Sequence, residues 1–221
     1  MSRCIKAGID AKDIFVTMHG SQKGRRSGAA ALLLVLSLCL AVPAHSQEVK
    51  TMDPSGQWQG LHGVLSLMLA GDALSFAYSA VFGATAHLCD GVGVAGRVAD
   101  GEYHYVDEQG SVAFVVTAHG VRMEAVSGIA SFCGANWSGD EFTKQGFKPV
   151  QRCTVTESKA HFHAVRRTPA TPRQAYVVKG DRVEVVPACF DGGDAWVLAR
   201  FKGPRGTTVG LFRKEALECQ D

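Results

Sequence analysis

The sequence predicts a mainly β protein made of two small antiparallel β domains that follow an amino-terminal export signal. Three observations lead to this prediction. Residues 58–219 break into short apolar stretches separated by glycine and aspartate. They contain no uninterrupted amphipathic window of 12 or more residues, which a helical bundle would need. An apolar run near the amino terminus has the form of a cleavable leader, and five cysteines follow it.

The first 46 residues are predicted to be a secretory leader. Its basic segment is followed by an apolar run of residues 29–42 and by a small-x-small cleavage site that ends at Ser46. The run is shorter than the roughly 20 residues that cross a bilayer, and Pro43 follows it, so we expect cleavage and no stable membrane insertion. Met18 is a candidate true start, because a chain beginning there has a leader of ordinary length.

The net charge changes sign along the remaining chain. Residues 47–150 hold 5 Lys and Arg against 11 Asp and Glu, whereas residues 151–221 hold 12 against 8. The asymmetry indicates either that the two halves attract each other or that the basic half meets an anionic envelope polymer. Two solvated faces without a partner explain the pattern equally well. No dense basic stripe with interleaved aromatic residues is present, so we expect no nucleic acid partner. We expect a periplasmic or secreted protein.

The first domain is predicted to be a series of antiparallel strands. Residues 63–83 alternate on either side of a Gly-Asp pair, which is typical of a β-hairpin. Two more strands flank a turn at residues 107–110. A last pair of strands is predicted at residues 120–128 and 129–139. An antiparallel sheet or a small barrel accounts for this order.

A connector at residues 145–152 carries Gly and Pro and coincides with the change of charge. We therefore predict a first domain at residues 47–148 and a second at residues 149–221. The second domain contains further strand-like segments separated by glycine-rich or proline-containing turns. These segments are residues 154–165, 175–186, 195–203 and 207–217.

The second domain also carries motifs of a known family. A Tyr- and Val-rich strand at residues 176–185, a Trp-Val pair at 196–197 and a Gly-Leu-Phe run at 210–212 resemble, in this order, a bacterial SH3-like domain. The match covers roughly residues 153–219, and it implies a small half-open barrel that binds or scaffolds in the cell envelope. Many relatives carry Trp where this chain has Leu211. The first half is similar, more loosely, to small exported disulfide-bearing β-domains, some associated with lysozyme-inhibitor-like proteins.

Five cysteines remain after the leader, in a compartment that favours disulfides. Cys89 and Cys133 lie in the first domain, while Cys153 and Cys219 bracket the second, so we expect these two bridges. Cys189 is then the odd thiol, although a bridge from it to Cys153 or to Cys219 is an open alternative. A hydrolytic role for Cys89 is the weaker hypothesis, because the glycines after it leave no helix N-terminus to activate a thiolate.

Aromatic and basic side chains of the second domain are the candidate ligand-binding residues. They can line a groove for an anionic peptide or glycan, and packing in the barrel core is the competing explanation for the aromatic ones. The candidates are Tyr176, Trp196, Arg200, Phe212 and Arg213.

Other patterns predict neither a metal site nor a catalytic site. His161 and His163 would share one strand face, but two imidazoles without further ligands do not make a metal site. The acidic pairs at 107–108 and 140–141 lie beside turn glycines, and we interpret them as solvated turn acids. No nucleophile elbow, phosphate-binding loop or dinucleotide fingerprint is present, so we expect no cofactor.

The sequence therefore predicts an exported, non-catalytic protein that binds a cell-envelope component, either a cell-wall polymer such as peptidoglycan or an envelope protein, through the SH3-like module. The alternative is an inhibitor of a hydrolase such as lysozyme. Such an inhibitor would bind a basic enzyme through an exposed loop of the acidic first domain.

Overall fold

Antiparallel β-strands account for nearly all of the regular secondary structure, which confirms the predicted fold class. The predicted leader and the start at Met18 lie outside the described residues. Within the part of the chain that is described, no helix has the length and apolar character needed to cross a membrane. The computed structural model describes residues 52–84, 86–128, 130–134, 137–167, 171–190, 193 and 195–220.

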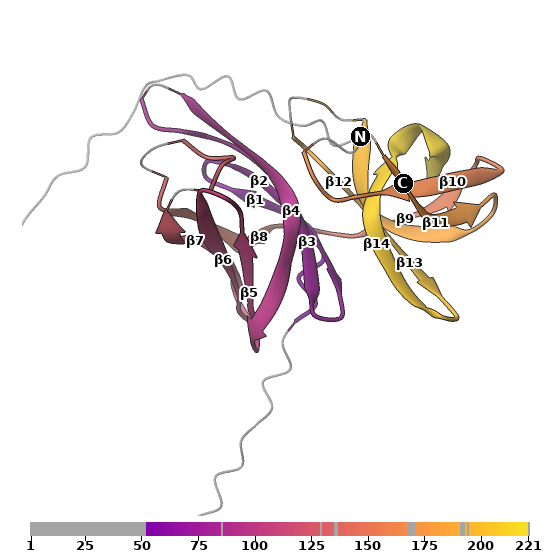
Figure 1. Ribbon diagram of the computed structural model, residues 1–221, viewed down its shortest axis with the longest axis horizontal. Helices are drawn as coiled ribbons and strands as arrows, with labels where there is room; N and C mark the ends of the chain where they lie inside the picture. The colour runs from indigo at the N-terminus through magenta and orange to yellow at the C-terminus, as the bar shows by residue number, and fades with distance from the viewer. Residues whose placement is uncertain are drawn as a thin grey trace, which may run out of the picture. The chain divides into compact units, whose positions relative to one another are not determined.

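The first eight strands form a closed antiparallel barrel (Figure 1). Each strand pairs with the next, and β1 closes the barrel by pairing with β8. The predicted hairpin is β2 and β3, with Gly71 at φ 59° in its turn, a conformation that favours glycine. The bounds are β1 Gly56–Gly60, β2 Gly63–Ala70, β3 Ala73–Phe82, β4 His87–Ala99, β5 Glu102–Val106, β6 Gly110–Val116, β7 Gly120–Gly128 and β8 Gly139–Pro149.

Large side chains fill the interior of the barrel. Alternate residues of each strand point inward, so Trp58, Phe76, Tyr78 and Phe114 are fully buried in one cluster. The rings of Phe76 and Phe114 lie 4.8 Å apart, centroid to centroid. The barrel is therefore a packed core built by strand alternation.

The segment between β7 and β8 differs from the strand predicted at residues 129–139. Its described residues form turns that place Phe132 and Trp137 in the barrel core. The Cys89–Cys133 disulfide ties the segment to β4. Burial of two large rings and the covalent bridge hold the segment over the barrel core, which explains why it does not add a strand.

The remaining strands form a second antiparallel sheet in the order β11-β10-β14-β13-β12-β9-β15 (Figure 1). A short 3-10 helix, η1, precedes the last strand. The bounds are β9 Gln151–Val155, β10 Lys159–His163, β11 Pro172–Val178, β12 Arg182–Pro187, β13 Trp196–Gly203, β14 Gly206–Arg213, η1 Lys214–Ala216 and β15 Leu217–Cys219.

The connector predicted at residues 145–152 is mostly strand. β8 continues to Pro149 and β9 begins at Gln151, so Val150 is the one residue between the two sheets. Pro149 ends the barrel strand because it has no backbone N–H to continue the ladder. The prediction mistook the glycine and proline of this stretch for a loop, whereas pairing with β1 keeps the backbone extended.

Both predicted disulfides are present. Cys89–Cys133 joins β4 to the segment before β8, and Cys153–Cys219 joins β9 to β15. Cys189 was expected to be the odd thiol, and this prediction is wrong because Cys189 is itself disulfide-bonded. That bond lies outside the described residues.

One face of the second sheet packs against the outer surface of the barrel. Met68 on β2 shares a buried apolar cluster with Leu198 on β13 and Leu211 on β14. The other face of the sheet has its own core, which contains Phe162 and Phe212. A part of the second sheet is therefore covered on both faces.

Candidate functional site

The structure divides the five predicted ligand-binding residues among different surroundings. Phe212 is fully buried in the core of the second sheet. Arg200 is 6% exposed and lies where the sheet meets the barrel. Tyr176, Trp196 and Arg213 keep part of their side chains at the surface. Three of the five candidates therefore remain available to a ligand.

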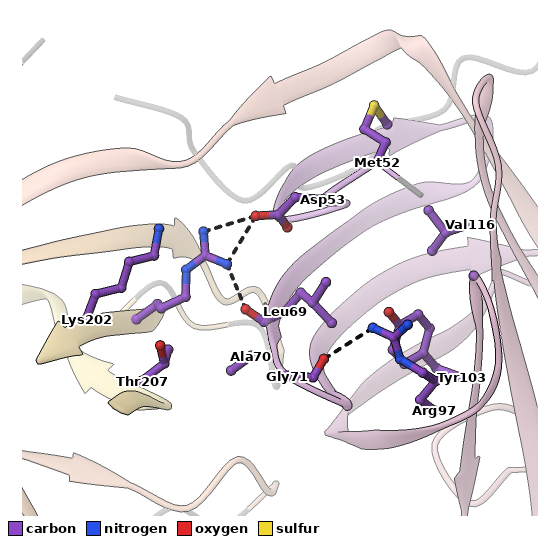
Figure 2. A pocket seen from close by; sticks show the side chains of 12 residues that line it. Met52, Asp53, Leu69, Ala70, Gly71, Arg97, Tyr103, Val116, Lys202 and Thr207 are labelled. Atoms are coloured by element: carbon purple, nitrogen blue, oxygen red, sulfur yellow. Dashed lines mark hydrogen bonds and ion pairs between the residues drawn. The ribbon is translucent and has the colours of Figure 1, made fainter. Parts of the chain in front are cut away.

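Arg200 joins the second sheet to the barrel. Its Nε donates to Glu184 Oε2 of the same sheet at 2.7 Å. Its Nη1 donates to three barrel acceptors: the Leu69 carbonyl at 2.7 Å, Ser55 Oγ at 3.1 Å and Asp53 Oδ2 at 3.2 Å. A cavity of about 260 Å³ lies at this junction. Figure 2 shows Asp53 and Leu69 among the residues that line it. Because the Arg200 guanidinium donates to acceptors on both sides of the junction, it links the second sheet to the barrel and has a structural role.

The acids bonded to Arg200 are held in their charged form. Burial alone would raise the pKa of Glu184, but hydrogen bonds from Arg200 and Lys202 outweigh it and bring that pKa below its ordinary value. Burial also acts to raise the pKa of Asp53. The hydrogen bonds from Ser55 and the charge of Arg200 outweigh this effect, so the pKa of Asp53 lies below its ordinary value. The junction is therefore a network of compensated charges.

The surface candidates belong to a row of four rings on one face of the second sheet. We call Tyr176, His161, His163 and Trp196 the aromatic strip. His161 and His163 point to the same face of β10, because alternate strand residues do, while Phe162 between them enters the core. The His161 ring lies 5.7 Å from that of Tyr176, and the His163 ring lies 4.8 Å from that of Trp196, measured between centroids.

A cation lies over the aromatic ring at each end of the strip. Lys159 Nζ is 4.3 Å from the centroid of the Tyr176 ring. The guanidinium carbon of Arg213 is 4.1 Å from the centroid of the Trp196 ring. Among the described residues, no carboxylate forms a salt bridge with either cation. Exposed cation–π contacts contribute only about 0.5–1 kcal/mol, so both cations can also reach an anion in solution.

The strip combines two kinds of recognition chemistry. Tyr176 is 51% exposed, and its flat ring can stack on a sugar or on an apolar side chain. Lys159 and Arg213 can bind carboxylates or phosphates, and Arg213 can do so with two parallel hydrogen bonds. The geometry therefore suits an elongated anionic ligand that lies across the strands.

Sequence reasoning missed part of this site. Lys159 was not among the candidates, and His161 and His163 were considered only as metal ligands. The alternating pattern Lys-x-His-x-His from residue 159 was the available signal, because it places three polar side chains on one face. Within the described residues, no group of three or more His, Cys, Asp and Glu could hold a metal ion.

The two acidic pairs also differ from each other. Asp107 is a turn acid, as predicted, and its Oδ1 accepts hydrogen bonds from the backbone N–H groups of Gln109 and Gly110. Asp140 was predicted to be solvated as well, and this is wrong because its side chain is buried. The error arose because a residue next to a turn glycine can still point into the barrel.

No family model matches the chain, and neither a curated protein nor a solved structure matches it. The resemblance of the second sheet to an SH3-like domain stays a prediction. Any function proposed for the chain therefore rests on the residues of the strip and their geometry.

Proposed function

We propose that the protein is an exported, non-catalytic binding protein that attaches to an anionic cell-envelope polymer, such as peptidoglycan, through the aromatic strip. The observation that supports this most is the row of four rings with Lys159 and Arg213 at its ends. The two bridges described above fit an oxidising compartment outside the cytoplasm.

Binding would combine stacking with ion pairing. Sugar rings of the polymer would lie against Tyr176 and Trp196, and carboxylates of its peptide stems would pair with Lys159 and Arg213. Each contact alone is weak in water. A polymer repeats its binding units, so a dissociated molecule rebinds to a neighbouring unit and the overall affinity rises.

Sedimentation with purified sacculi tests this proposal. The protein is produced from the full sequence and recovered in its exported form, and the bound fraction is measured at low salt. We expect Arg213→Gln to weaken binding about tenfold, which is the loss of one charge-assisted contact. Tyr176→Ala should have a comparable effect through lost stacking.

Arg205→Gln is the matched control. Arg205 is exposed in the turn between β13 and β14, outside the strip, and the substitution removes the same charge. It should leave binding unchanged. Equal losses in Arg205→Gln and Arg213→Gln would show that only net charge matters, and undiminished binding of Tyr176→Ala would contradict the role of the strip.

The second candidate function is inhibition of a hydrolase of the lysozyme type by the acidic barrel. The observation that favours it is Leu61, which is 89% exposed at the β1–β2 turn of a half-chain with a net charge of −6. An exposed apolar side chain in acidic surroundings suits a basic partner. A lysozyme clearing assay with the exported protein tests it, and undiminished clearing at excess protein would exclude it.

A further inference from the structure

A second cavity, of about 600 Å³, lies on the barrel beside the β1–β2 turn. Strands β7 and β8 supply its other wall, and its lining includes Leu61, His62, Glu124, Asp140 and Glu141. None of these residues belongs to the aromatic strip, which is part of the second sheet. The cavity is therefore separate from the site proposed for polymer binding.

Asp140 is a buried acidic group in the lining of this cavity. Its side chain is only 3% exposed. Its carboxylate accepts hydrogen bonds from the Tyr78 hydroxyl at 3.2 Å and from the Glu141 backbone N–H at 3.0 Å. His62 Nδ1 lies 3.3 Å from Oδ1 of the same carboxylate. Among the described residues, no lysine or arginine pairs with this carboxylate.

The hydrogen bonds to Asp140 come from groups that do not carry a permanent positive charge. Burial raises the pKa of Tyr78 well above its ordinary value, and the nearby Asp140 charge raises it further, so the hydroxyl stays protonated and donates. A buried carboxylate with no fixed counter-charge is costly for a folded protein. Arg200 provides a fixed counter-charge at the junction of the barrel and the second sheet, whereas the basic group beside Asp140 is the His62 ring, which is charged only when protonated.

The surroundings of the cavity favour a cationic ligand. Glu124 and Glu141 add acidic groups to its lining, and Arg122 is engaged in an ion pair with Glu124. Residues 47–150 have a net charge of −6, which would steer a basic partner towards the barrel. Leu61 stands at the rim with most of its side chain in solvent. A partner with a surface of its own would bury Leu61, whereas a small amine would not.

We propose that this cavity receives a cationic side chain, the ammonium of a lysine or the guanidinium of an arginine, from a basic partner protein that packs against Leu61. The cation would pair with the Asp140 carboxylate, and Glu141 on the outer face of β8 would add negative charge at the opening. The proposal deepens the second candidate function, since both need a basic partner at Leu61, but the peptide site can hold where lysozyme inhibition fails. It is independent of polymer binding by the second sheet.

Chemical-shift titration of the ¹⁵N-labelled exported protein tests the proposal. The probe is the peptide acetyl-Ala-Leu-Arg-Leu-Ala-amide, and the same peptide with citrulline in place of arginine is the uncharged isostere. We expect saturable shifts at the amides of residues 60–63 and 139–141 with the arginine peptide. The citrulline peptide should bind at least about tenfold more weakly, because it cannot supply the counter-charge.

Variants locate the site. Asp140→Asn and Glu141→Gln should each weaken the arginine peptide about tenfold. Glu108→Gln removes the same charge from an exposed position outside the cavity and should change nothing. If Asp140→Asn fails to fold, Glu141→Gln still tests the site, because Glu141 is exposed.

Leu61→Ser separates a protein partner from a small amine. It should weaken the peptide but leave binding of arginine amide, a free small cation, unchanged. Equal binding of the arginine and citrulline peptides would overturn the cation site. Arginine amide that binds as tightly as the peptide, together with no effect of Leu61→Ser, would overturn docking of a protein.

Discussion

Arg200 shows how a residue chosen for its chemistry can have a structural role. Its guanidinium was a candidate for ligand binding. In the structure it instead donates hydrogen bonds to acceptors on both the second sheet and the barrel. The acceptors on the barrel lie more than 130 residues away in the sequence. Such a contact stabilises the junction only when every partner is present, because each buried polar group then has its hydrogen bond.

Replacing Arg200 with glutamine should lower the free energy of unfolding by about 3 kcal/mol, since it leaves Glu184 and the Leu69 carbonyl with fewer donors at a buried junction. Urea unfolding followed by circular dichroism measures the change. Lys202→Gln is the comparison, because Lys202 also bonds Glu184 but is 61% exposed, and its loss should cost less than about 1 kcal/mol. Similar losses in the two variants would contradict the structural role of Arg200.

At the scale of elements, β4 is adapted to the segment that packs over the barrel core. A Cβ at Gly91 would lie 2.5 Å from the Phe132 ring, which is too close for a real contact. A Cβ at Gly96, on the same strand, would have no other atom within 4 Å and would face open space. The glycine at 91 therefore permits the close approach of Phe132, and the bridge to Cys133 holds it there.

These two glycines give a matched pair of substitutions. Gly91→Ala should lower the free energy of unfolding by about 2 kcal/mol, because Phe132 must shift out of its packed position. Gly96→Ala should be close to neutral or slightly stabilising, since alanine fits an extended conformation. Thermal unfolding of both variants measures the difference. Equal stability would show that Phe132 relaxes without cost.

At the scale of the whole molecule, the barrel and the second sheet are joined by an apolar cluster and by charges. Met68, Leu198 and Leu211 are buried in the cluster, and the Arg200 network lies beside it. Acid acts on the charges and leaves the apolar contacts intact. The pH dependence of stability therefore reports on the charged part of the junction.

Stability should fall as the pH drops below about 5, because Asp53, Asp107 and Glu184 all have pKa values lowered by folding. A lowered pKa means that the folded state holds the carboxylate more strongly in its charged form than the unfolded state does. The contribution is complete above the ordinary values of 3.8 for Asp and 4.5 for Glu, and it is lost as the pH falls through the folded values. Urea midpoints between pH 7 and 3 measure the loss.

Arg200→Gln serves as the control for this pH dependence. Without the guanidinium, Asp53 and Glu184 lose a group that lowers their pKa, so the acid-induced fall in stability should be shallower than in the unchanged protein. An identical fall in both proteins would assign the effect to other carboxylates.

The parts of the fold that depend on neighbours in sequence were predictable. The hairpin of β2 and β3 follows from alternation around a Gly-Asp turn. The two disulfides were expected from the halves of the chain in which their cysteines lie, with pairings of Cys189 left open, although each bridge joins residues far apart in the sequence. The strip was predictable only in part. Phe212 and Arg213 are adjacent on one strand, so alternation already places them on opposite faces, and only Arg213 lies at the surface.

The sequence by itself determined the β fold class and the β2–β3 hairpin, because these depend on alternation and on turn residues. It also indicated the two bridges, while other pairings of Cys189 stayed open. The tertiary structure decided which side chains reach solvent. Arg200 and Trp196 share a strand face, and the barrel covers the first while leaving part of the second exposed. Asp140 is buried for the same reason, since burial depends on residues far away in the chain that local pattern does not reveal.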